Sequence, residues 1–225
     1  MKTLTLFHGS DHIVNTPIYV YGKRTNDYGQ GFYCTEDADL AREWSVEESR
    51  DGFLNEYSLN TTTLRILDLT SPDFSVLQWI TLLLRNRTFD LFSDFGSTAR
   101  EYLLDHFSID TSPYDIICGY RADDSYFTYA QNFLNNVISV QTLARALKLG
   151  NLGTQIVLVS EKAFGKITFQ NAESVNSQIW YPQKEERDKS ARATYKQIRE
   201  SGTFMDDVFL LDIIRGKLEA SDVRI

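Results

Sequence analysis

The sequence predicts a mixed α+β domain, with short, mostly antiparallel strands and helices at the periphery of the sheets. Of its 225 residues, 42% are hydrophobic and 13% aromatic, which is enough apolar material for one core. The strand-like runs are short and do not alternate regularly with helices, as they would in a doubly wound sheet. No internal repeat or low-complexity segment is visible, so a single domain is expected over residues 1–225.

The first strand is predicted over residues 2–7, where apolar and polar side chains alternate. His8 is expected at the end of this strand, because Gly9 and Ser10 favour a break in regular structure. Such a break would leave the His8 side chain at a cleft. Residues 11–23 are mixed in character, contain proline and glycine breakers, and are expected to cross that cleft.

Residues 27–44 form the most informative stretch of the chain. The two glycines within residues 29–31 permit a tight turn, and residues 32–34 are an aromatic, strand-like run. Thr35 is expected to cap a helix, with acidic residues in the first turn, where the helix dipole favours them. Apolar residues then recur at helical spacing as far as Trp44, so the stretch is predicted as turn, strand, cap and helix.

Two strands are predicted in the middle of the chain, over residues 64–69 and 116–119. Between them, apolar residues at helical spacing predict a helical block over about residues 71–109. We interpret this block as an insertion that covers the core or helps to select a substrate. Asp123 and Asp124 are neighbours whose side chains point apart, so helix capping suits them better than sharing a proton.

Residues 154–160 form a β-branched run that predicts a central strand, with Gln155 among its first residues. Ser139 is expected to cap the helix that precedes this strand, and another strand is expected over residues 166–169. Residues 184–225 are predicted as a helical tail. Its first part is a solvated helix rich in both charges, and a later apolar segment docks on the core or on a partner.

The formal net charge of −8 and the pI near 4.9 argue against a broad nucleic-acid-binding face. The chain shows no signal peptide and no apolar run of membrane length, so we expect a cytoplasmic protein that does not bind membranes. In that compartment Cys34 and Cys118 are expected to be reduced thiols. No third ligand joins His8 and His12 at metal-site spacing, so no metal site is predicted.

The order of these segments resembles the nicotinamide-binding half of ADP-ribosyltransferases of the diphtheria-toxin and poly(ADP-ribose) polymerase branch. His8 and Gly9 match that family's His-Gly pair, and Tyr33 matches the tyrosine of its glycine-rich, aromatic run. Trp44 stands where the family has the second aromatic residue of a nicotinamide sandwich, and Gln155 stands where it usually has a glutamate. The whole chain also resembles a bacterial family of domains of unknown function that is usually grouped with these transferases.

This resemblance implies a split core of two mostly antiparallel sheets whose cleft binds NAD+ as a co-substrate. It implies that His8, Tyr33 and Gln155 carry the catalysis. Tyr33 and Trp44 would hold the nicotinamide, the backbone of Gly9 would bind its carboxamide, and His8 would bind ribose hydroxyls. The other expected contacts with NAD+ are Ser10, Arg24, Gly31 and Phe32.

Gln155 is a departure from the family pattern. A glutamine keeps an acceptor oxygen at a similar length, but it carries no charge and cannot act as a general base at neutral pH. We therefore expect transfer of single ADP-ribose units rather than chain elongation. On the same reasoning, Gln155→Glu is expected to keep or raise NAD+ hydrolysis.

The predicted function is NAD+-dependent mono-ADP-ribosyl transfer, with the expected biology of a bacterial toxin or phage-defence effector neutralised by a partner protein. Two alternatives remain open at this stage. One is an NAD+ glycohydrolase, and the other is a catalytically inactive module of the same fold that senses NAD or binds proteins. The acceptor of the ADP-ribose is left open among protein side chains, nucleic acid and small molecules.

Overall fold

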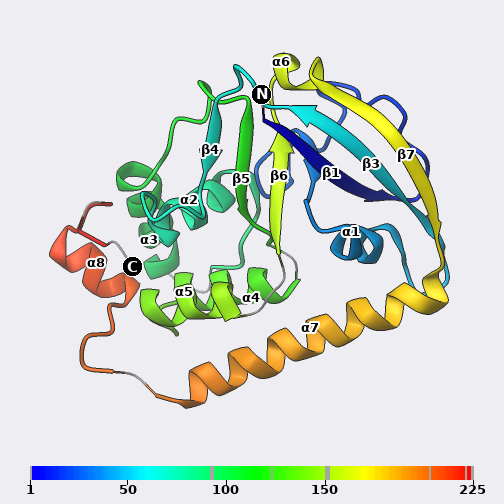
Figure 1. Cartoon of the computed structure of the whole chain (residues 1–225). Coiled ribbons are helices and arrows are strands. Elements are labelled where there is room, and N and C mark those ends of the chain that lie inside the picture. The colour runs from blue at the N-terminus through cyan, green and yellow to red at the C-terminus, as the bar shows by residue number, and fades with distance from the viewer. Residues whose placement is uncertain are drawn as a thin grey trace.

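The computed structural model describes residues 2–91, 94–122, 124–149, 153–202, 204–220 and 222–223. Within these residues the chain forms two sheets with helices around them, which confirms the predicted α+β class (Figure 1). One sheet has three strands in the order β1-β3-β7, and the other has four in the order β2-β6-β5-β4. The pair β4–β5 is parallel and the other strand pairs are antiparallel, as expected of a mostly antiparallel core.

The chain passes from one sheet to the other several times, but β4, β5 and β6 are consecutive strands of the same sheet. The strands are β1 (Thr3–Ser10), β2 (Phe32–Cys34), β3 (Gly52–Asn60), β4 (Ile66–Asp68), β5 (Ile116–Tyr120), β6 (Thr154–Leu158) and β7 (Ile167–Val175). The helices are α1 (Ala38–Ser45), α2 (Val76–Asn86), α3 (Asp94–His106), α4 (Asp124–Leu134), α5 (Val140–Leu149), α6 (Glu161–Phe164), α7 (Ser177–Glu200) and α8 (Leu210–Gly216). Helices α2 to α5 and α8 lie on the side of the four-stranded sheet, whereas α1 lies beside β1 (Figure 1).

Strand β6 is central, as its β-branched sequence predicts, because it lies between β2 and β5. Its alternating side chains serve two cores. Ile156 and Leu158 pack with Leu6 of β1 in a cluster between the two sheets. Val157 faces the other way and joins the larger core, which the helices build against the four-stranded sheet. Both faces of β6 are therefore buried, which accounts for its nearly continuous apolar sequence.

The helical block predicted over residues 71–109 contains α2 and α3. Helix α2 begins after Ser75, whose hydroxyl accepts from the Leu77 amide at 3.2 Å while the Gln78 side chain accepts from the Ser75 amide at 2.9 Å. This reciprocal capping box fixes the start of the helix. The block packs against α4, α5 and α8, so it is built into the larger core.

The prediction that Gly9 and Ser10 interrupt β1 was wrong. The strand continues through Ser10, which pairs with Phe53 of β3, so His8 lies inside the strand rather than at its end. A side chain at position 9 would place its Cβ 1.9 Å from the carbonyl oxygen of Ala41 in α1. Gly9 is therefore explained by the close approach of α1 to the strand.

The prediction that Thr35 caps α1 was also wrong. Asp37 is the cap, and its carboxylate accepts from the amides of Asp39 at 2.9 Å and Leu40 at 3.1 Å. Thr35 instead exchanges backbone hydrogen bonds with Phe7 and so joins the two sheets. Ser139 does cap α5, because its hydroxyl accepts from the Thr142 amide at 3.0 Å; Asp123 lies outside the described residues.

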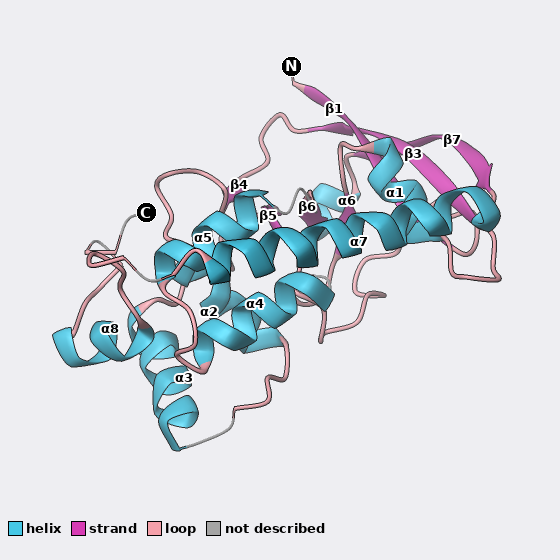
Figure 2. Cartoon of the chain, turned by 90° about the horizontal axis from the view of Figure 1, so that it is seen from below, coloured by secondary structure: helices cyan, strands magenta, loops and turns pink. Residues whose placement is uncertain are grey.

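Helix α7 begins at Ser177, seven residues before the predicted start of the tail at residue 184, and Asn176 caps it. It runs past α1, which lies beside the three-stranded sheet, and past α4 and α5, which lie on the side of the four-stranded sheet (Figure 2). Arg187 of α7 pairs with the buried Glu43 of α1 at 2.8 Å, and Tyr195 packs into the larger core. The tail is thus integral to the fold rather than merely solvated.

Both cysteines are free thiols, as predicted. Cys34 of β2 and Cys118 of β5 both lie opposite Ile156 of β6, one on each side of that strand. Two strand spacings of about 4.8 Å separate them, and disulfides need Cα atoms within about 7 Å. Among the described residues, no helix combines the length and the apolar character that crossing a membrane requires.

Candidate active site

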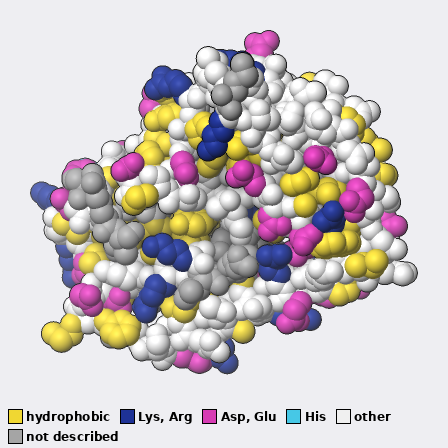
Figure 3. Space-filling view, viewed as in Figure 1, with side chains coloured by type: hydrophobic (Ala, Val, Ile, Leu, Met, Phe, Trp, Pro, Cys, Tyr) yellow, Lys and Arg dark blue, Asp and Glu magenta, His cyan; other side chains and the backbone are white. Residues whose placement is uncertain are grey.

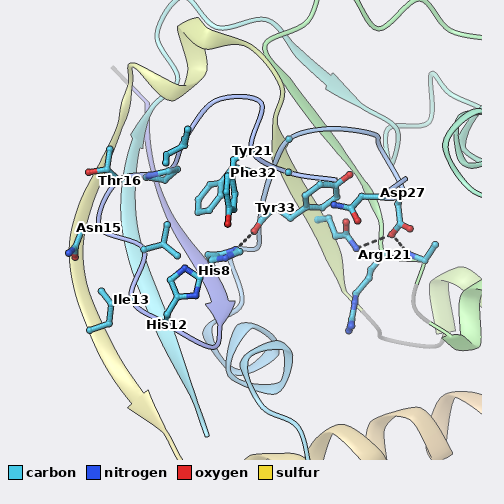
Figure 4. Close-up of a pocket in the computed structure, with 18 of the residues that line it drawn as sticks. His8, His12, Ile13, Asn15, Thr16, Tyr21, Asp27, Phe32, Tyr33 and Arg121 are labelled. Carbon is cyan, nitrogen blue, oxygen red and sulfur yellow. Dashed lines mark hydrogen bonds between the residues drawn. The ribbon is translucent and has the colours of Figure 1, made fainter. Parts of the chain in front are cut away.

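The two sheets meet where β1 and β2 are joined by one backbone bridge. Phe7 donates to the Thr35 carbonyl at 2.7 Å, and Thr35 donates to the Phe7 carbonyl at 2.9 Å. Next to this bridge, Nδ1 of His8 lies 2.7 Å from the carbonyl oxygen of Tyr33 (Figure 4). The junction of the sheets therefore brings together the His8 and Tyr33 that the sequence singled out.

A cleft of about 680 Å³ opens at this junction. His8, Tyr33 and Gln155 all line it, so the three predicted catalytic residues share one cavity. Residues 12–18 form one wall, as expected for a segment that crosses the cleft (Figure 4). The volume falls within the range of about 300–1,000 Å³ that is usual for small-molecule sites.

His8 is held as a neutral acceptor. Burial lowers the pKa of His8 below its usual value, although the hydrogen bond to the Tyr33 carbonyl opposes this shift. Because a carbonyl oxygen only accepts, Nδ1 carries the proton, and Nε2 of the neutral ring is left as an acceptor. The ring also packs on Phe32 at a centroid distance of 4.5 Å, which fixes its orientation.

Tyr33 is anchored at its hydroxyl, which donates to the Gly29 carbonyl at 2.7 Å and accepts from the Tyr28 amide at 3.0 Å. Gly29 has a φ of +77°, so the predicted glycine turn exists and closes around this hydroxyl. Burial raises the pKa of Tyr33. The phenol is therefore a structural anchor, and what it can offer a ligand is its ring.

The strand register explains why Tyr33 and Gln155 share the cleft. Tyr33 of β2 lies directly opposite Val157 of β6. Side chains two residues apart on a strand point to the same face, so Gln155 and Val157 share the face of Tyr33. The residue opposite Gln155 on β5 is Gly119, which adds no side chain to that face.

The Gln155 side chain is buried, with 6% of its surface exposed, yet one of its polar atoms has no partner. Its Nε2 donates to Oδ2 of Asp27 at 3.3 Å. Its Oε1 has no hydrogen-bond partner within the described part of the chain. A buried acceptor without a partner normally costs stability, and in the wall of a cleft it is available to a ligand.

Asp27 is a site residue to which the sequence patterns assign no role. It is 5% exposed, and it accepts from Arg87 at 2.5 Å and from the Ala122 amide at 3.0 Å. Burial raises the pKa of Asp27, and the charge of Arg87 opposes that shift. Arg87 lies at the end of α2, so the helical insertion contributes directly to the cleft. An acid beside a glycine turn is only a weak sequence signal for such a role.

Trp44, the predicted second aromatic residue of the sandwich, lies next to the described lining of the cleft rather than within it. It is outside the set of described residues that line the cleft, and the Arg121 guanidinium lies over its ring at 5.0 Å from the centroid. Nothing in the described part of the chain hydrogen-bonds its buried Nε1. Arg121 itself lines the cleft (Figure 4), so the indole supports a cation there through a cation–π contact.

The remaining predicted contact residues divide into two groups. Gly31 and Phe32 line the cleft. Gly9, Ser10 and Arg24 do not, within the described residues. The Ser10 hydroxyl is engaged with the His12 carbonyl at 2.8 Å and with Asn55 at 2.9 Å, and Arg24 is exposed.

The charges near the cleft favour an anionic ligand. Among the described residues of its lining, Arg87 and Arg121 are basic, and Asp27, which is paired with Arg87, is the one acid. Elsewhere, acidic and basic side chains are interspersed over the face seen in Figure 3. In the residues that the structure describes, no group of three or more His, Cys, Asp or Glu side chains is placed to hold a metal ion.

Comparison with known proteins identifies a family. The family model described as "Protein of unknown function (DUF3990)" matches residues 4–169, which is more than half of the chain. The matched region runs from β1 into β7 and includes every residue named above as lining the cleft, whereas α7 and α8 lie beyond it. No curated protein and no solved structure matches the chain. The chain belongs to the DUF3990 family.

Proposed function

We propose that this protein binds NAD+ in the cleft between its two sheets and acts as a mono-ADP-ribosyltransferase with a split-sheet core. The observation that carries the proposal is the unpartnered Oε1 of Gln155, buried in the same cleft as His8 and Tyr33. Support also comes from the volume of the cleft and from the resemblance of its His, Tyr and Gln residues to the transferase pattern.

In this proposal the two neutral acceptors, Nε2 of His8 and Oε1 of Gln155, bind ribose hydroxyls, which are donors. The Tyr33 ring offers a face to the nicotinamide, a contact worth about 0.5–1.5 kcal/mol for an aromatic pair. The carboxamide contact that the resemblance gives to the backbone of Gly9 is left out of this proposal, because Gly9 is not among the described residues that line the cleft. Arg121 rather than the exposed Arg24 meets the phosphates, because Arg121 lines the cleft.

The reaction breaks the bond between C1′ of the ribose and the nicotinamide nitrogen. The nicotinamide leaves as a neutral molecule with the bonding electron pair, and a nucleophilic atom of the acceptor forms the new bond to C1′ and loses its proton. The positive charge that develops on the ribose is stabilised by fixed acceptors around it. Gln155 cannot remove the acceptor's proton at neutral pH, so single transfers are expected rather than elongation.

The proposal is tested by incubating the protein with labelled NAD+ and a cell lysate while nicotinamide release is followed. Release together with a labelled macromolecule supports the transferase. Release without a labelled macromolecule identifies an NAD+ glycohydrolase. Binding of NAD+ without release identifies an NAD-sensing module, and the absence of binding contradicts the proposal altogether.

The proposed biological role is that of a toxin or phage-defence effector held in check by a partner protein. It rests on the resemblance alone. Expression in a bacterial host is expected to slow growth, and His8→Ala is expected to relieve the effect. Equal inhibition by both forms would exclude enzymatic toxicity.

A further inference from the structure

The amide of Gln155 can face the cleft in two ways, with either its oxygen or its nitrogen. The two choices are chemically opposite, because the oxygen only accepts hydrogen bonds and the nitrogen only donates them. Asp27 decides between them. Its carboxylate only accepts, so the group that lies 3.3 Å from Oδ2 must be Nε2, and Oε1 is turned away from it.

Asp27 is itself fixed by hydrogen bonds from several segments, so it can determine the orientation of the Gln155 amide. Oδ1 accepts a hydrogen bond from the Arg87 guanidinium at 2.5 Å. Oδ2 accepts hydrogen bonds from the Ala122 amide at 3.0 Å and from the Gln155 side chain. Its backbone carbonyl accepts from the Asn86 side chain at 3.0 Å. The loop before β2, the end of α2 and the segment after β5 therefore converge on one carboxylate.

We propose that Asp27 is the positioning residue of this site, which holds the Gln155 amide so that its oxygen faces the ribose hydroxyls. This inference rests on the proposed function for the identity of the ligand. The orientation of the amide itself does not depend on it. The helical insertion contributes to this positioning through Arg87, which neutralises Asp27 and keeps its carboxylate in place.

The contact with Asp27 reverses an expectation drawn from the sequence. In Gln155→Glu the introduced carboxyl would face the carboxylate of Asp27, and two buried carboxylates in contact share a proton. While protonated, the introduced group can donate its O–H to Asp27 and still present an oxygen to the cleft. Once ionised, it is repelled by Asp27, and the orientation is lost. The family's usual residue is therefore expected to harm this enzyme rather than help it.

The first test measures nicotinamide release by Gln155→Glu, as a ratio to the wild-type rate, across a range of pH. Among the described residues, the charged or titratable groups that act on Asp27 are Arg87 and the Tyr28 and Tyr33 hydroxyls, while His8, His12, Tyr21 and Arg121 line the same cleft, and all of them remain in the variant. We expect the ratio to fall by about 10- to 100-fold as pH rises, the range seen for residues that orient metal ligands. Adding Asp27→Asn should abolish that fall, because the introduced amide is neutral and does not repel the introduced carboxylate.

The outcomes separate positioning from a merely structural role. A ratio that is constant with pH, or a double variant that is less active than Gln155→Glu alone, would overturn the inference. If Asp27 has only a structural role, Asp27→Asn should lower the rate of nicotinamide release further when it is added to Gln155→Glu. If Asp27 positions Gln155, adding Asp27→Asn should restore the rate that Gln155→Glu loses at high pH.

The second test needs no NAD+, so it still decides the matter if the protein does not cleave that molecule. In the ¹H–¹⁵N spectrum of the unmodified protein, the Gln155 side-chain protons, assigned by their loss in Gln155→Ala, should exchange slowly with solvent. In Asp27→Ala they should exchange as fast as those of the exposed Gln170, whereas the control Asp39→Ala should leave them unchanged. Fast exchange in the unmodified protein, or slow exchange in Asp27→Ala, would overturn the inference.

Discussion

Nδ1 of His8 lies 2.7 Å from the carbonyl oxygen of Tyr33, beside the Phe7–Thr35 bridge that joins the two sheets. The bond ties the histidine on β1 to the backbone of β2, and it determines which ring nitrogen carries the proton. The geometry of the junction and the chemistry of the cleft are thus set by the same contact. A change at either strand would disturb both.

His8 should make the stability of the protein sensitive to acid. Burial lowers the pKa of His8 in the folded state below 6.5, the usual value for a free imidazole, so between those two values the unfolded chain binds more protons than the folded protein. The stability that neutral His8 contributes is fully present above the pKa of the unfolded state. It is lost as the pH falls from that value through the pKa of the folded state. Urea unfolding between about pH 5 and 8 should therefore show a steeper acid loss for wild type than for His8→Gln. Parallel curves would contradict this assignment.

Arg187→Ala should destabilise the fold strongly, because it leaves the carboxylate of Glu43, only 3% exposed, without its bidentate partner. Removing one member of a buried ion pair typically costs about 3–5 kcal/mol. The matched control is Arg192→Ala on the same helix, whose pair with Asp188 is exposed and should be worth less than about 0.5 kcal/mol. Equal losses in urea unfolding would show that α7 does not depend on this pair.

Neither cysteine should react quickly with a thiol reagent in the native protein. Burial raises the pKa of both thiols, that of Cys118 to about 12, so the reactive thiolate is scarce at neutral pH. Native protein should label slowly with a colorimetric disulfide reagent, and denatured protein should label rapidly at both positions. Rapid labelling of native protein at Cys34 would contradict its place in the core between the sheets.

Local patterns in the sequence predicted the elements that carry the site. The aromatic run of β2 and the β-branched run of β6 each show a clear strand pattern, and they put Tyr33 and Gln155 on one sheet face. The glycine turn before β2 was also predictable, because Gly29 adopts a φ that favours glycine. Patterns of this kind depend on neighbours in the sequence, so the sequence alone can reveal them.

The predictions that the structure corrects failed because contacts between residues distant in the sequence determine these positions. Gly9 was expected to break β1, but it is a glycine because α1 approaches it closely. Asp27 gained its role from Arg87 and Gln155, which are 60 and 128 positions away in the sequence. The helix that carries Trp44 was predicted correctly, but Arg121 covers its ring, and no local pattern reports that contact.

Nicotinamide release from NAD+ by wild type, His8→Ala and His106→Ala tests the central claim most directly. His106 is a matched control, since it lies on α3, where it stacks on Tyr102 and pairs with Glu219. Wild type and His106→Ala should release nicotinamide at similar rates, and His8→Ala should be slower by about 100-fold, the cost of a misplaced reacting group. Equal rates for all three proteins, or no release and no binding of NAD+ by wild type, would contradict the account.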